Sequence, residues 1–69
     1  MTLKTTLAFL DTVGKIVICI EDGEPFILTE ANGVGGLDKD KIKKYLDHEV
    51  HFTKTIKNGG TNELYIYVY

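Results

Sequence analysis

The sequence predicts one α+β domain, residues 1–69, in which a small antiparallel four-stranded sheet packs against two short helices. Three observations lead to this fold class. Four short segments are rich in β-branched and aromatic residues, turns with glycine or asparagine separate them, and apolar residues at helical spacing occur near the N-terminus and at residues 38–46. A chain of 69 residues has a thin core, because it buries only about 60% of the surface that it exposes when unfolded.

The first segment is predicted to be a helix. Leu3, Leu7 and Leu10 recur at i, i+4 and i+7, which places them on one helical face, and Thr2 is a suitable N-cap. The alternative is a strand at residues 5–10 that turns through residues 11–14 and pairs with the next segment. We favour the helix, and the fold class is the same in both cases.

The segment that follows is predicted to be a central strand. Isoleucines alternate from Ile16 to Ile20 on one face, and Val17 and Cys19 occupy the other, so both faces are apolar. An Asp-Gly turn then returns the chain as the second strand of a hairpin. The four predicted strands span residues 15–21, 26–29, 49–57 and 63–69.

A short helix is predicted at residues 38–46, after a glycine-rich loop at residues 31–36 that we expect to be flexible. Asp38 is a good N-cap, and Leu37 and Ile42 are spaced to pack against each other across the start of the helix. A helix of this length depends on tertiary packing.

The last two strands are predicted to form a hairpin whose register is set by apolar burial. Placing Phe52 opposite Val68 and Ile56 opposite Leu64 buries the apolar side chains of both strands on one face. This register requires a loop with an odd number of residues, with a left-handed glycine or a bulge. A two-residue loop would instead set Phe52 against Tyr67, with the apolar sets on opposite faces.

Composition narrows the function classes. The net charge is −2, and the eight basic residues are all lysines, which weighs against sequence-specific reading of nucleic acid by arginine forks. Cys19 is the only cysteine, so no internal disulfide or thiolate zinc site is possible, and we interpret it as a core thiol. The N-terminus has no basic region before an apolar stretch, and no segment approaches the roughly 20 apolar residues of a membrane span. We therefore expect a cytoplasmic protein without membrane association.

No catalytic, cofactor or metal constellation is recognised. No Ser-His-Asp set or activated nucleophile is visible, so we expect no enzyme activity and no cofactor. His48, Glu49 and His51 are close in sequence, but side chains alternate along a strand, so we expect no metal site. The glycine-rich loop lacks a phosphate-binding fingerprint, and Asp38 would repel an anion at the helix start.

The terminal strand carries the candidate binding residues. Its tyrosines project from the face opposite Leu64, Ile66 and Val68, and tyrosine provides a large contact area with a polar tip. With the predicted register, the candidate partner-binding residues are Tyr65, Tyr67, Tyr69, His51, Thr53 and Thr55. The alternative is that the N-terminal helix covers this face and the tyrosines are core residues. We also expect the terminal strand to be a sheet edge, which together with the thin core predicts a homodimer.

Four segments also carry a resemblance: Thr-Leu-Lys-x-x-Leu-x-x-Leu-Asp, Lys-Ile-Val-Ile-Cys-Ile-Glu-Asp-Gly, Lys-Lys-Tyr-Leu-Asp-His-Glu-Val and Leu-Tyr-Ile-Tyr-Val. In these segments and in their order along the sequence, the chain resembles small uncharacterised proteins encoded by phages and prophages of low-GC Gram-positive bacteria. Its glycine-rich loop is longer than theirs. The resemblance implies a non-enzymatic protein that binds, and in some cases inhibits, a protein of the host cell. The alternative function is nucleic-acid binding, in which a tyrosine stacks on a base and the lysines of the predicted helix contact phosphates. These lysines are Lys39, Lys41, Lys43 and Lys44.

Overall fold

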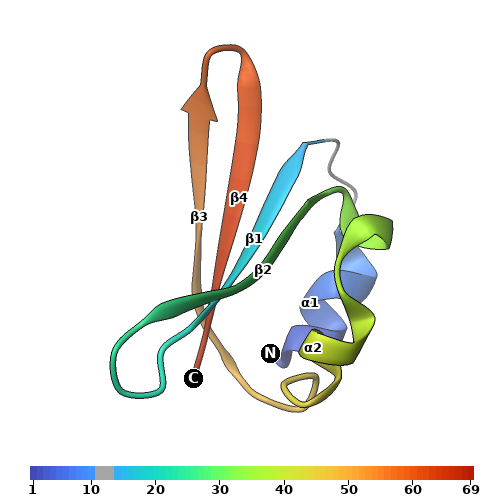
Figure 1. Ribbon diagram of the computed structural model, residues 1–69, viewed down its shortest axis with the longest axis vertical. Coiled ribbons are helices and arrows are strands. Elements are labelled where there is room, and N and C mark those ends of the chain that lie inside the picture. Colours follow the sequence, from blue (N-terminus) through green and yellow to red (C-terminus); the bar gives the residue numbers. More distant parts are fainter. Residues whose placement is uncertain (11–13) are drawn as a thin grey trace.

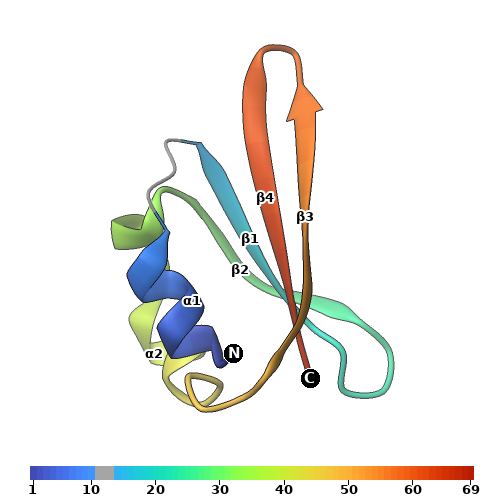
Figure 2. The ribbon, with the colours of Figure 1, turned by 180° about the vertical axis from the view of Figure 1, so that it is seen from behind.

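The computed structural model describes residues 1–10 and 14–69 and confirms the α+β class. Its elements are α1 (Leu3–Phe9), β1 (Lys15–Ile20), β2 (Phe26–Asn32), the 3₁₀ helix η1 (Val34–Gly36), α2 (Lys39–Lys43), β3 (Val50–Asn58) and β4 (Thr61–Val68). The strands form one sheet in the order β2-β1-β4-β3. The helices lie on one side of the sheet in Figures 1 and 2, so the molecule has two layers.

The sheet is mixed, so the prediction of a purely antiparallel sheet is wrong. The β1–β2 and β3–β4 pairs are antiparallel hairpins, as predicted, but β1 pairs in parallel along its whole length with residues 63–68 of β4. The segment with α2 joins the two hairpins, and the second hairpin adds to the first through its last strand. Parallel neighbours need such a crossover, in contrast to strands joined by a tight turn.

The terminal strand β4 lies inside the sheet, between β1 and β3, so its prediction as an edge strand is wrong. The edges are β2 and β3. The inner position has a clear physical reason, because Ile66 and Val68 are completely buried and a central strand excludes water from its apolar side chains. The prediction that β1 is central is confirmed, with residues Ile16 to Ile20 all buried.

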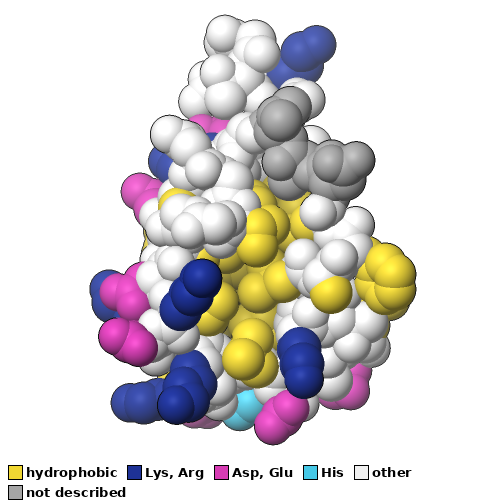
Figure 3. Space-filling model, turned by 90° about the vertical axis from the view of Figure 1, so that its right-hand side faces the viewer, with side chains coloured by type: hydrophobic (Ala, Val, Ile, Leu, Met, Phe, Trp, Pro, Cys, Tyr) yellow, Lys and Arg dark blue, Asp and Glu magenta, His cyan; other side chains and the backbone are white. Residues whose placement is uncertain are grey.

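The core lies between the sheet and the helices. Its buried members are Leu3, Ile16, Ile18, Ile20, Leu37, Ile42, Ile66 and Val68. Figure 3 looks onto the helical side, where apolar side chains remain visible between flanking lysines. The helical layer therefore covers the core incompletely.

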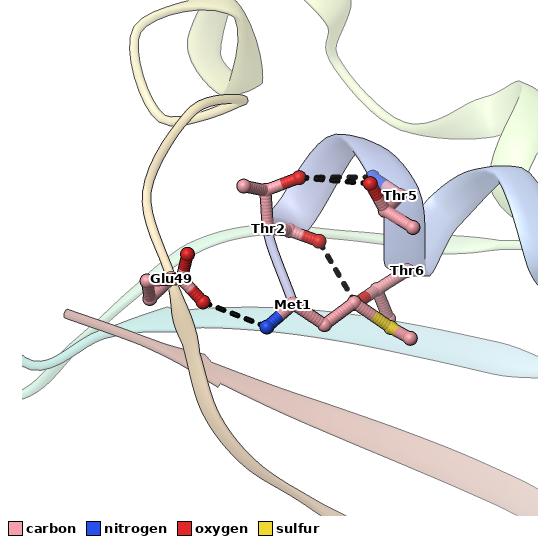
Figure 4. A network of polar contacts seen from close by, with 5 residues as sticks. All are labelled: Met1, Thr2, Thr5, Thr6 and Glu49. Atoms are coloured by element: carbon pink, nitrogen blue, oxygen red, sulfur yellow. Dashed lines mark hydrogen bonds and ion pairs between the residues drawn. The ribbon is translucent and has the colours of Figure 1, made fainter.

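The helix α1 confirms the prediction for the N-terminus, and the alternative strand at residues 5–10 is wrong. Thr2 caps it by accepting a hydrogen bond from the Thr5 amide at 3.3 Å, and the Thr6 hydroxyl donates to the Thr2 carbonyl at 3.0 Å. The Met1 amino group pairs with Glu49 at 2.7 Å (Figure 4). The alternative also predicted a turn at residues 11–14, of which residues 11–13 lie outside the described residues.

The helix α2 is shorter than predicted. It begins as expected, because the Asp38 carboxylate accepts hydrogen bonds from the amides of Asp40 and Lys41, and both Leu37 and Ile42 are buried. It ends at Lys43 and continues as turns, in place of a helix to residue 46. The predicted loop at residues 31–36 is also wrong in part, since β2 extends to Asn32 by pairing with β1 and η1 follows.

The predicted register of the β3–β4 hairpin is wrong. Phe52 pairs with Tyr67 and Ile56 with Glu63, around a two-residue turn of Gly59 and Gly60. Both glycines have positive φ, 59° and 87°, so the expected left-handed glycine is present, as a tight type I′ turn. A bulge also occurs, between Val50 and Phe52 at the other end of the hairpin. This turn matches the twist of the strands and fixes their register.

Candidate functional site: the aromatic face of the sheet

The candidate site is the face of the sheet opposite the helices, which we call the aromatic face. Directly paired residues of neighbouring strands point to the same side of a sheet. Tyr65 pairs with Val17 and Lys54, and Tyr67 pairs with Cys19 and Phe52. These side chains share the aromatic face, while Ile66 points into the core. Both helices of the described residues pack on the core side (Figure 2), so the alternative in which α1 covers the tyrosines is wrong.

Five rings contact one another in a continuous chain. The ring centroids of Tyr65 and Tyr67 are 6.5 Å apart. The ring of Tyr67 stacks on that of Phe52, with a centroid distance of 4.4 Å and an angle of 14° between the ring planes. The rings of His51 and Phe52 form an edge-to-face pair with centroids 5.0 Å apart, and the ring of His51 stacks on that of Tyr69 at a centroid distance of 4.8 Å. The Phe52–Tyr67 distance is at the lower limit for favourable aromatic pairs, and the other three contacts lie within the range. The rings therefore stabilise one another's orientation and form a preorganised surface.

Tyr65 and Tyr67 cover apolar side chains of β1, whereas Phe52 and Tyr69 are exposed to solvent. Val17 is completely buried and Cys19 is 6% exposed, although both lie on the aromatic face, because Tyr65 and Tyr67 are half-buried over them. Phe52 is 44% exposed and Tyr69 55% exposed. The surface offered to a partner is thus formed mainly by the exposed rings.

Two titratable groups of the aromatic face, the Cys19 thiol and the Tyr65 hydroxyl, are held in their neutral forms. Burial raises the pKa of the Cys19 thiol, and the carboxylate of Glu21 adds to the effect. Partial desolvation, together with the charge of Glu63, raises the pKa of Tyr65. Cys19 is therefore a buried thiol, as the sequence predicted, with little thiolate at neutral pH, but it lies beneath the rings and not in the core between the sheet and the helices.

The two histidines are directed to different partners. Nδ1 of His48 lies 2.8 Å from the carbonyl oxygen of Tyr69, while Nδ1 of His51 lies 3.1 Å from the Glu21 carboxylate. The Glu49 carboxylate is engaged by the Met1 amino group. In the described part of the chain, no three His, Cys, Asp or Glu side chains gather as a possible metal site.

The structure brings together only part of the predicted binding set. Tyr65, Tyr67, Tyr69 and His51 belong to the chain of rings. Thr53 and Thr55 pair with Ile66 and Leu64, so the expectation that they share the tyrosine face is wrong. The cause is the register: the two-residue turn shifts β3 by one position, which moves alternate side chains to the other side.

The sequence interpretation missed four residues of this face. Phe52, Lys54 and Ile56 come from β3, and Ile27, which is 57% exposed, comes from β2 opposite Cys19. The signal for the β3 residues was present in the sequence, because a Gly-Gly pair is typical of two-residue hairpin loops.

The four lysines of the alternative function lie elsewhere. Lys39, Lys41 and Lys43 belong to α2 and Lys44 follows it, and all four are exposed. Ile42 anchors α2 in the core, on the helical side of the sheet. Because α2 lies on one side of the sheet (Figure 1) and the rings lie on the other face, these lysines and the rings are on opposite sides of the sheet.

Comparison with models of protein families, with curated proteins and with solved structures gave no match for this chain. Within the described residues, neither helix has the length and apolar character needed to cross a membrane.

Proposed function

We propose that this protein is a non-enzymatic binding module that recognises another protein through its aromatic face. The observation that carries the proposal is the continuous chain of five rings on the face that the helices leave open. Aromatic side chains dominate the energetics of protein interfaces, because they bury a large area and lose little conformational entropy on binding. The resemblance to phage and prophage proteins suggests a host-cell protein as the partner and inhibition as the outcome.

The charge distribution supports a protein partner more than a nucleic acid. A nucleic-acid site combines stacking rings with cations that contact the backbone. The lysines of α2 and Lys44 are separated from the rings by the thickness of the sheet. On the ring side, Lys15 is paired with Glu30 at 3.4 Å, which among the described residues leaves Lys54 beside Tyr65 as a single cation rather than a basic groove. His51 is likewise held against a carboxylate, that of Glu21.

The test is affinity capture from a lysate of a low-GC Gram-positive host, followed by binding measurements with the purified partner. Tyr69→Ser removes an exposed ring whose loss disturbs little of the core, and should weaken binding by about 2 kcal/mol if the ring is an interface anchor. Phe26→Ser is the matched control, because Phe26 is 46% exposed and pairs with Ile20 on the helical side.

A salt titration separates the two classes of partner. Binding to a protein through rings should depend weakly on salt, whereas phosphate contacts make log affinity fall steeply with log salt concentration. Equal binding by wild type and Tyr69→Ser, together with a loss of binding in a variant of the α2 lysines, would refute the proposed function.

A further inference from the structure

The outer edge of β3 presents backbone groups at alternate residues. In a hairpin with a two-residue turn, the residues flanking the turn form a hydrogen-bonded pair, here Asn58 and Thr61, and such pairs recur at every second position. The amides and carbonyls of Thr53, Thr55 and Lys57 consequently point away from β4. The start of this edge is covered by the N-terminal segment, because the Val50 amide donates to the Met1 carbonyl at 2.8 Å.

An apolar groove adjoins this free edge on the helical side. It has a volume of about 410 Å³ and is lined by residues of the α1 region and of the β3–β4 hairpin. Its lining residues include Phe9 and Leu10 from the α1 region, Val50 and Thr53 from β3, and Leu64 from β4. Phe9 is 78% exposed at its rim. Thr53 belongs to both features, since its backbone points outward and its side chain lines the groove.

The edge also has a charge preference. Lys54 lies on the aromatic face of β3, and Lys57 lies on the groove side, as the alternation from Thr53 requires. The described carboxylates form no ion pair with either lysine. A strand added at this edge would therefore be favoured by carboxylates placed opposite the two lysines.

We propose that the outer edge of β3 and the adjoining groove form a binding site for an extended acidic and apolar peptide segment. The segment adds to the sheet as an antiparallel strand beside β3, exchanging backbone hydrogen bonds with Thr53, Thr55 and Lys57. Its residue opposite Thr53 places a bulky apolar side chain over the groove. Main-chain pairing supplies affinity, and the groove and the lysines supply specificity. Phe52 of the aromatic face also lines the groove, but the site otherwise consists of the β3 edge and residues on the helical side, and it does not rest on the proposed function.

The probe is the capped peptide Asp-Thr-Val-Asp-Leu-Thr-Val, titrated into the ¹⁵N-labelled protein. In antiparallel pairing, its two aspartates fall opposite Lys57 and Lys54 and its leucine opposite Thr53. We expect saturable shifts at the amides of β3 and α1, and binding about tenfold weaker when both aspartates are replaced by lysine. No saturable binding at millimolar peptide, or shifts centred on Tyr65 and Tyr67, would overturn the proposal.

Backbone pairing is tested from both sides of the interface. Methylation of the peptide nitrogen of the first valine, opposite Thr55, removes one donor and should weaken binding at least about tenfold. Thr55→Pro removes an outward amide of the protein, which an edge strand tolerates, and should have the same effect with Thr55→Ala as its control. Undiminished binding of the methylated peptide refutes strand addition, whether or not the proline variant folds.

The groove is tested with a pair of exposed phenylalanines. Phe9→Ser should weaken binding of the peptide severalfold, and Phe26→Ser on the opposite edge strand should not. Sedimentation and amide shifts of the free protein over a concentration series reveal whether β3 pairs with a second copy. A dimer that Thr55→Pro dissociates would assign the edge to self-association and overturn the peptide site.

Discussion

Replacing Tyr67 by serine should destabilise the protein much more than replacing Tyr69, although the two tyrosines are only two residues apart. Tyr67 is half-buried, lies opposite Cys19, and stacks on Phe52 at 4.4 Å. Truncating a fully buried aromatic side chain costs about 3 to 5 kcal/mol. For a half-buried ring, we expect a loss of about 2 kcal/mol in the free energy of unfolding.

Tyr69 has fewer contacts to lose. Its side chain is 55% exposed, and among the described residues its ring stacks only on His51, a contact worth about 0.5 to 1.5 kcal/mol. Its backbone stays in place, because its amide donates to the Glu49 carbonyl and its carbonyl lies 2.8 Å from Nδ1 of His48. We expect Tyr69→Ser to cost about 1 kcal/mol or less.

Thermal unfolding followed by circular dichroism measures the difference. For a domain of this size, 1 kcal/mol corresponds to about 4 to 8 °C in Tm, so Tyr67→Ser should lower Tm by roughly 8 to 16 °C and Tyr69→Ser by less than about 8 °C. Equal shifts for the two variants would refute the burial argument. The total stability expected for this length is roughly 3 to 10 kcal/mol, so losing about 2 kcal/mol at each of Tyr65 and Tyr67 would remove a large part of it. Binding experiments are therefore best performed with Tyr69 variants.

Three further predictions concern local structure. Gly60→Ala should lower the free energy of unfolding by about 1 to 2 kcal/mol in denaturant titrations, because alanine is strained at a φ of 87°; an unchanged midpoint would contradict the tight turn. Asp38→Ala should cost about 1 kcal/mol in the same assay, whereas Asp38→Ser, which retains a cap, should cost less. The raised pKa of Cys19 keeps its thiol protonated in the folded state, so folding stability should fall as pH rises past the ordinary thiol pKa of about 8.5. Cys19→Val should remove that part of the pH dependence, and native Cys19 should resist alkylation at neutral pH.

Local signals in the sequence predicted local structure well. Thr2 and Asp38 mark the starts of α1 and α2. In the structure, the side-chain oxygen of each residue accepts a hydrogen bond from a backbone amide in the first turn of its helix. Their spacing alone identified Leu37 and Ile42 as the apolar residues at the start of α2, and both are buried. Such signals depend on a few neighbouring residues, and those interactions are present whatever the rest of the chain does.

Strand order depends on interactions that the sequence pattern does not specify. The alternation in β4 shows which side chains are apolar, but not whether the neighbour of Ile66 on its far side is solvent or Ile18 of a parallel strand. Antiparallel hairpins follow from short turns, whereas the β1–β4 pairing joins segments separated by most of the chain. The apolar residues on both faces of β1 correctly predicted a central strand, but they did not show that one of its neighbours is β4.

The register error has the same origin as the aromatic face. The rule that apolar residues share one buried face assumes that the other face is solvated, and on that assumption Phe52 and Ile56 belong with Leu64. The tight Gly59-Gly60 turn sets the register instead and places Phe52 on Tyr67. A sequence that keeps this turn must leave two apolar β3 side chains on the face without helices. The exposed aromatic surface is therefore a consequence of the turn, and a partner that covers it would bury apolar area that the fold itself leaves open.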